Sequence, residues 1–288
     1  MPDVRPRRAC VQAGFQTRGL TVHPVTGDER IVMRTLKITI AYEGTAYVGW
    51  QRQSNGSSIQ GCLEAALAEI EGAPVAVVGA GRTDAGVHAI GQVASVQLRH
   101  QIAPDALQRA VNARLPSDIR VVTAEVSPEP FHARFDAAAK TYRYRLLHDA
   151  VMSPFDCRYG WHVGEPLDHE RMVDAARALV GKHDFAAFQA TGSSTHSTVR
   201  TLFELTLSRA PRDPRSVARG AGAALTLIDA RGSGFLRHMV RVMVGTLVEV
   251  GRGQRDRAAV EHALRSRDRG SAGQTAPPHG LFLMRVEY

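Results

Sequence analysis

The pattern of hydrophobic and polar positions predicts three strands early in the chain. LKITIAY alternates, so that Leu36, Ile38 and Ile40 share one face, as in a half-buried strand. VAVVGA, at residues 75–80, is short and apolar, as is typical of a buried strand, and QVASVQL, at residues 92–98, alternates again. A glycine-rich loop therefore joins the second of these strands to the third.

Two helices are predicted around these strands. Ser57 followed three residues later by Gln60 has the form of a capping box. The apolar residues that then recur at helical spacing are Ile59, Leu63, Leu67 and Ile70. Gly72 is expected to end this helix, and PDALQRAVNARLP, at residues 104–116, predicts a second helix that begins and ends at a proline.

The second half mixes strands and helices in a similar but looser order. Asp168 is expected to cap a helix that Gly181 ends, and an unusually apolar helix is predicted over residues 234–251. Segments rich in Arg, Gly, Ser and Pro, at residues 208–222 and 265–280, predict loops. The predicted strands are residues 140–147, 199–207, 224–230 and 280–288. This mixed order predicts two α+β halves.

Residues 1–33 show neither helical nor strand periodicity, so we expect a disordered N-terminal tail, with Met33 as an alternative start. The predicted domains after this tail are an N-terminal half at 34–136, which carries the GRTDAG loop, and a C-terminal half at 137–288.

The net charge of the chain indicates what kind of partner it binds. The 288 residues include 36 Lys and Arg against 28 Asp and Glu, a formal net charge of +8. This excess favours a phosphate-rich partner such as a nucleic acid, although a soluble protein can also be basic without one.

Three distant cysteines, Cys10, Cys62 and Cys157, exclude a disulfide framework and a CxxC metal knuckle. No apolar run is long enough to span a membrane, so we expect a cytoplasmic protein.

The glycine-rich loop GAGRTDAGVHAIGQV, at residues 79–93, raises the question of a cofactor site. A dinucleotide loop needs a third glycine where Asp84 stands, and a helix where a strand is predicted. The 12 histidines have no metal-ligand spacing. We therefore expect neither a cofactor nor a metal. Asp84 is either an ordinary turn residue or a functional carboxylate for which the glycines leave room.

Six motifs in this order resemble those of the tRNA pseudouridine synthase A family: YEGTAYVGWQRQ, GRTDAGVH, VNARLPSDI, FHARFDA, KTYRYR and FLRHMVRVMVG. The resemblance implies an α+β fold of two ferredoxin-like halves that share a central, largely antiparallel sheet, with helices packed on it and an active-site cleft between them. It also implies an isomerase that converts uridine to pseudouridine without a cofactor, with Asp84 as the nucleophile.

A carboxylate nucleophile needs a cationic neighbour to stay ionised in a partly desolvated pocket. Arg82 is adjacent to it in the sequence, whereas Arg241 lies in the apolar helix with Arg237 and Gly245 four residues before and after it. Periodicity alone leaves these three positions equally compatible with a solvated helix face. The resemblance implies that Arg241 forms the ion pair with Asp84.

Tyr142 and Tyr144 share one strand face, and either could simply be buried against a helix. The resemblance implies that Tyr142 stacks on the target base. Further candidate tRNA contacts, each of which could instead be a solvated surface residue, are Arg52, Arg82, His132 and Arg134.

The resemblance further implies a homodimer that acts on the anticodon stem-loop of tRNA, at nucleotides 38 to 40. Two alternatives stay open: a non-catalytic RNA-binding module, which does not explain the glycines around Asp84, and a nucleotide-binding enzyme, which lacks a phosphate-binding lysine motif.

Overall fold

The computed structural model describes residues 33–127, 130–193, 195–211 and 224–288. The predicted N-terminal tail lies outside these residues, apart from Met33. The strands are β1 (Arg34–Tyr42), β2 (Val77–Gly79), β3 (His88–Leu98), β4 (Ile119–Val126), β5 (Ala139–Leu147), β6 (Trp161–His162), β7 (Gly181–Asp184), β8 (Val199–Pro211), β9 (Ala224–Gly232) and β10 (Leu281–Glu287). The helices are α1 (Ile59–Glu71), α2 (Pro104–Asn112), α3 (His169–Arg177), α4 (Met239–Gly251) and α5 (Arg257–Ser266).

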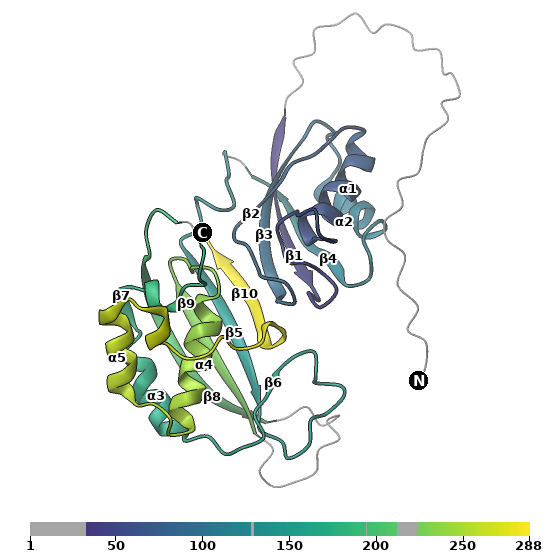
Figure 1. The fold of residues 1–288 in the computed structure, drawn as a ribbon. Coiled ribbons are helices and arrows are strands. Elements are labelled where there is room, and N and C mark those ends of the chain that lie inside the picture. The colour runs from purple at the N-terminus through teal and green to yellow at the C-terminus, as the bar shows by residue number, and fades with distance from the viewer. Residues whose placement is uncertain (1–32, 128–129, 194, 212–223) are drawn as a thin grey trace, which may run out of the picture. The chain divides into compact units, whose positions relative to one another are not determined.

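The strands form one sheet in the order β4-β1-β3-β10-β5-β9-β8-β7, with β2 paired to β3 and β6 to β5. All pairings are antiparallel except β3 with β10 and β5 with β6. Helices α3, α4 and α5 lie together beside the strands of the second half, and α1 and α2 lie beside β1 to β4 (Figure 1). The predicted α+β fold with a shared, largely antiparallel sheet is confirmed.

Strand β10 joins the two halves of the sheet. Phe282 and Leu283 pair with His88 and Ala89 of β3, and Leu283 also faces Tyr142 of β5. Leu283 is fully buried, and buried apolar residues of both halves belong to one connected core. Residues 33–288 form one unit, and the division into an N-terminal half at 34–136 and a C-terminal half at 137–288 stays a prediction.

The N-terminal helix begins one residue later than the sequence pattern suggests. Ser58, not Ser57, is the N-cap of α1, because its side chain accepts a hydrogen bond from the Gly61 N–H at 3.2 Å. Gly72 ends the helix in the left-handed conformation, at φ 71°. This ending confirms the glycine prediction, since glycine adopts that conformation without a steric cost.

Two helix boundaries in the second half differ from the prediction. Asp168 caps α3 as expected, but the helix ends at Arg177, and Gly181 instead begins β7 with φ 117°. Helix α4 begins at Met239, because His238 before it has a left-handed φ of 63°. The predicted loop 265–280 begins inside α5, and β8 extends to Pro211, inside the predicted loop 208–222. Residues 212–222 of that loop lie outside the described part of the chain.

Candidate active site

Asp84 lies in a reverse turn between β2 and β3. The Val87 N–H donates to the Asp84 carbonyl at 3.1 Å, and Gly86 occupies the third position of the turn with φ 76°. A positive φ at this position is the requirement of a type II turn, which favours glycine there. Asp84 can therefore be both a turn residue and a functional carboxylate, because its backbone forms the turn and its side chain is free to make other contacts.

The backbone before Asp84 is held from several sides. The Tyr42 hydroxyl and the Thr83 hydroxyl are hydrogen-bonded at 2.8 Å, and the Trp50 N–H donates to the Thr83 carbonyl at 3.1 Å. The Gln92 side chain donates to the Gly81 carbonyl at 2.9 Å. Thr83 and Gln92 are buried, so these bonds are shielded from water. The carboxylate is thus presented from a loop with little freedom to move.

Arg241 of α4 forms an ion pair with Asp84. Its Nη1 lies 3.2 Å from Oδ2, and the side chains are only 12% and 25% exposed for Arg241 and Asp84, respectively. The Arg241 Nε donates to the Ala276 carbonyl at 2.8 Å, and the Ala276 N–H returns a bond to the Arg241 carbonyl at 3.1 Å. The guanidinium is therefore oriented by the backbone on one side and by the carboxylate on the other.

His238 is a second neighbour of Asp84. Its Nε2 lies 3.6 Å from Oδ2, which is long for a hydrogen bond. Burial lowers the pKa of His238, and the positive charge of Arg241 adds to this, although the Asp84 charge opposes it. The left-handed backbone of His238 ends the preceding loop and turns the chain into α4. The same local geometry thus places the side chains of His238 and Arg241 near one carboxylate oxygen, Oδ2 of Asp84.

Tyr142 of β5 is buried close to Asp84. Burial raises its pKa, and the charges of Tyr42 and Asp84 raise it further, so the phenol stays protonated. The Phe235 ring packs edge-on against the Tyr142 ring at a centroid distance of 5.1 Å. Tyr144 is different, because its hydroxyl donates to the Pro277 carbonyl at 2.7 Å and the residue is fully inaccessible. Of the two tyrosines, Tyr142 is the one whose pKa is raised by the Asp84 charge.

The sequence model of the tRNA pseudouridine synthase family matches residues 38–136 and 175–288. The chain belongs to this family. It is 46% identical over 256 residues to the tRNA pseudouridine synthase A of Syntrophotalea carbinolica, covering 89% of this chain and 97% of that protein. It is 47% identical over 259 residues to that of Solibacter usitatus, and 44% over 256 residues to that of Geotalea uraniireducens, covering in each case 89% of this chain and all of the relative.

Two of the glycines around Asp84 allow close packing of protein atoms and do not leave space for a substrate. A side chain at Gly79 would put its Cβ 2.5 Å from the Trp50 ring, and one at Gly91 would lie 2.4 Å from the Met284 carbonyl oxygen. Protein atoms already fill both places. The expectation that these glycines clear room for a substrate is therefore wrong at Gly79 and Gly91.

The other predicted contact residues do not touch Asp84 within the part of the chain that the structure describes. Arg82 and Arg134 are exposed, and Arg52 is 72% exposed and pairs with Glu64 at 3.2 Å. The His132 Nδ1 accepts the backbone N–H groups of residues 134 and 135, each at 3.2 Å, so it caps a turn. Their role as tRNA contacts stays a prediction.

Sequence reasoning missed three residues near the site: His238, Phe235 and Lys140. His238 and Phe235 stand inside the motif FLRHMVRVMVG, but its apolar pattern predicted helix, so no separate role was assigned to them. The strand alternation places Lys140 on the face of Tyr142, which is a signal that the sequence does contain.

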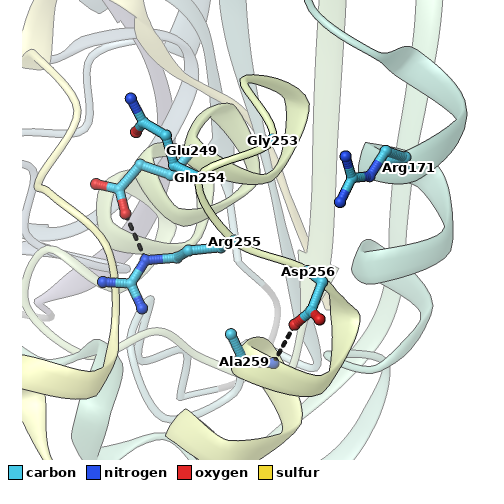
Figure 2. Close-up of a pocket in the computed structure, with 7 residues that line it drawn as sticks. All are labelled: Arg171, Glu249, Gly253, Gln254, Arg255, Asp256 and Ala259. Atoms are coloured by element: carbon cyan, nitrogen blue, oxygen red, sulfur yellow. Dashed lines mark hydrogen bonds and ion pairs between the residues drawn. The ribbon is translucent and has the colours of Figure 1, made fainter.

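A hollow of about 600 Å³ lies away from this site, between α3 and the start of α5 (Figure 2). Three of its four charged side chains, all except Arg171, are already engaged. Arg255 pairs with Glu249 at 2.5 Å, and the Asp256 side chain caps α5 by accepting the Ala259 N–H at 2.9 Å (Figure 2). The hollow therefore has the character of a surface recess between helices.

Two further findings concern metal sites and membrane-spanning helices. Among the residues described, no group of three or more His, Cys, Asp or Glu side chains is arranged to hold a metal ion. No helix in the described ranges combines the length and the hydrophobicity of a membrane span.

Proposed function

We propose that this protein isomerises uridine to pseudouridine in the anticodon stem-loop of tRNA, at nucleotides 38 to 40, with Asp84 as the nucleophile and without a cofactor. The proposal rests on membership of the tRNA pseudouridine synthase family, whose members act as isomerases. The single observation that carries the assignment of Asp84 is its ion pair with Arg241, at 3.2 Å, across 157 positions of the sequence.

The chemistry agrees with this arrangement. The reaction breaks the C1′–N1 bond and forms a C1′–C5 bond, while C5 loses a proton and N1 gains one, so the atoms balance within one nucleotide. A carboxylate acts as a covalent nucleophile when it is ionised and partly shielded from water. Both Arg241 and His238 approach Oδ2 of Asp84, so we assign the attack to Oδ1. Attack at C1′ and attack at C6 of the base both fit this assignment.

Tyr142 is the proposed partner of the target base. Its protonated phenol and its position beside Asp84 support a contact with a base that has been flipped out of the stack. Phe235 lies edge-on to the ring and would line the same place. Arg52, Arg82, His132 and Arg134 are proposed to contact tRNA outside this pocket.

Replacing Asp84 tests the proposal. Asp84→Asn keeps the shape of the side chain but removes the charged nucleophile, so we expect pseudouridine formation on unmodified tRNA transcripts to be abolished while tRNA affinity changes little. Asp105→Asn, which alters an exposed carboxylate of α2 paired with Arg109, is the matched control and should be fully active. Mapping of pseudouridine nucleotide by nucleotide is the measurement, and it also checks positions 38 to 40.

The same measurement separates the alternatives. A non-catalytic RNA-binding module would bind tRNA without forming pseudouridine, and normal modification by Asp84→Asn would remove the nucleophile assignment. A nucleotide-binding enzyme would bind free nucleotides whether or not tRNA competes.

We also propose a homodimer that acts in the cytoplasm, as the family resemblance implies. Light scattering of the purified protein gives the oligomeric state.

A further inference from the structure

Lys140 of β5 lies against the loop that carries Asp84. The alternation of the strand puts Lys140 on the same face as Tyr142, two residues further along. A Cβ placed on Gly81 would lie 3.5 Å from the Lys140 Nζ and 3.6 Å from its Cε, in ordinary contact. The ammonium group is thus beside Gly81, three residues before the carboxylate.

Lys140 has no carboxylate partner among the residues that the structure describes. Within the residues that the structure describes, no carboxylate comes within 4.0 Å of its Nζ, and its cross-strand neighbours are Gly232 and Val286. Burial, together with the positive charges of Arg134 and Arg200, lowers the pKa of Lys140 to about 8. An ammonium group that is withdrawn from water beside other cations is unfavourable unless an anion joins it.

In the described part of the chain, neither Arg134 nor Arg200 pairs with a carboxylate. Arg200 donates to the carbonyls of Ser197 and Val199, at 2.9 and 2.7 Å, and the Arg134 guanidinium lies over the Phe135 ring. Other arginines of the same sheet are neutralised, such as Arg143 by Asp229 at 2.7 Å and Arg231 by Glu287 at 2.6 Å. Lys140, Arg134 and Arg200, which we call the Lys140 cluster, therefore form a local excess of positive charge.

The surroundings indicate which anion completes the cluster. Phe135 is 74% exposed, and its ring stacks on His132 at 4.2 Å, so a large aromatic surface is open beside Arg134. Open aromatic rings next to cations are typical of sites that hold single-stranded nucleic acid, in which bases stack and phosphates pair with the cations. We propose that the Lys140 cluster binds a backbone phosphate of the substrate RNA strand next to the uridine at Asp84. This inference rests on the proposed function.

The first experiment measures the affinity of the full chain for an unmodified tRNA transcript over a series of salt concentrations. Each phosphate that a cation neutralises contributes about 0.7 to 0.9 to the slope of log affinity against log salt. Lys140→Met should lower this slope by about that amount, and Lys140→Arg should restore it, because arginine keeps the charge. Lys182→Met, at an exposed position of β7, is the matched control and should leave the slope unchanged.

The second experiment identifies the phosphate. Anticodon stem-loop RNAs are made with one uncharged methylphosphonate at a time, and each is bound to the wild-type protein and to Lys140→Met. One position should weaken the wild-type complex but not the Lys140→Met complex, since both changes remove the same contact. If no position is non-additive with the lysine substitution, the proposal is overturned.

Folding and activity controls keep the outcomes distinct. Lys140→Met removes a half-buried charge and should fold with a melting temperature at or above that of the wild type. An unchanged salt slope in this folded variant overturns the phosphate site even if the wild-type protein forms pseudouridine. Conversely, absence of pseudouridine in the wild-type reaction, together with a non-additive phosphate position, overturns the proposed function and leaves the RNA-phosphate site in place.

Discussion

Asp84 owes its chemical character to residues that are distant in the sequence. Arg241 supplies the positive charge, and the Ala276 carbonyl holds the other side of the guanidinium. His238 approaches the same carboxylate oxygen in its neutral form, because burial lowers its pKa. Arg241 is therefore the cation that pairs with the Asp84 carboxylate, whereas His238 lies near the same oxygen at a distance that is long for a hydrogen bond.

At this scale, Arg241→Met should lower the rate of pseudouridine formation about a hundredfold or more, because the carboxylate loses its fixed cation. It should also destabilise the fold by about 1–3 kcal/mol, since Arg241 is mostly buried and bonded to Ala276. Arg241→Lys should recover activity only in part, because one ammonium does not reproduce the planar geometry. Single-turnover rates and urea unfolding measure the two effects.

The control is Arg237→Met, which removes an exposed arginine just before α4 and should be nearly as active as the wild type. Near-normal turnover by a folded Arg241→Met variant would contradict the ion pair as a requirement of catalysis.

At the scale of the elements, two segments bring the site together. Strand β10 lies between β3 and β5, so the loop before β3 and Tyr142 of β5 become neighbours through it. Helix α4 is buried on nearly all sides, which fixes Arg241 at its first turn. Gly91 lets β10 approach β3, because any Cβ at this position would collide with the Met284 carbonyl.

Gly91→Ala should therefore destabilise the protein by about 1–3 kcal/mol, the usual cost of overpacking. The collision at 2.4 Å is with backbone, which cannot rotate away, so β10 must shift and activity should fall with stability. Gly81→Ala, in the same motif, would make only ordinary contacts of 3.5 to 3.8 Å with Lys140 and is the matched control for stability. Equal melting temperatures for the two variants would refute the packing argument.

At the scale of the whole molecule, several histidines are held neutral by the fold. Burial lowers the pKa of His88, His148, His169, His238 and His279. His88 illustrates the reason, because its Nδ1 accepts the Gly44 N–H at 3.0 Å and would lose this bond on protonation. Its Nε2 lies 2.9 Å from the Arg158 carbonyl, so the neutral ring already satisfies both sides.

Stability should consequently fall as the pH drops below about 6.5, the ordinary histidine value. In this range the unfolded chain binds more protons than the folded one, so acid favours unfolding. The urea midpoint should decrease between pH 7.5 and pH 5.5, and His88→Gln should make this decrease smaller. A midpoint that stays constant or rises would show that these histidines are not held neutral.

The sequence by itself determined most of the elements and the candidate nucleophile, but no pattern predicted β4, β6, β7 or α5. Alternation located β1 and β3, Asp168 and Gly72 marked helix ends, and the motif around Asp84 identified the loop. These features depend on local spacing and side-chain type, which a sequence contains directly. The start of α4 was wrong, because the left-handed backbone of His238 is set by the fold around it and not by its own propensity.

Only the tertiary structure decided what surrounds Asp84. Periodicity left Arg241 equally compatible with a solvated face, and burial in α4 together with the Ala276 contact removed that alternative. For the same reason, the sequence did not predict that Lys140 lacks a carboxylate partner among the described residues, nor that His238 lies near Asp84. Electrostatic partners depend on distance in space, and the sheet brings together strands that are far apart in the chain, so no local pattern specifies them.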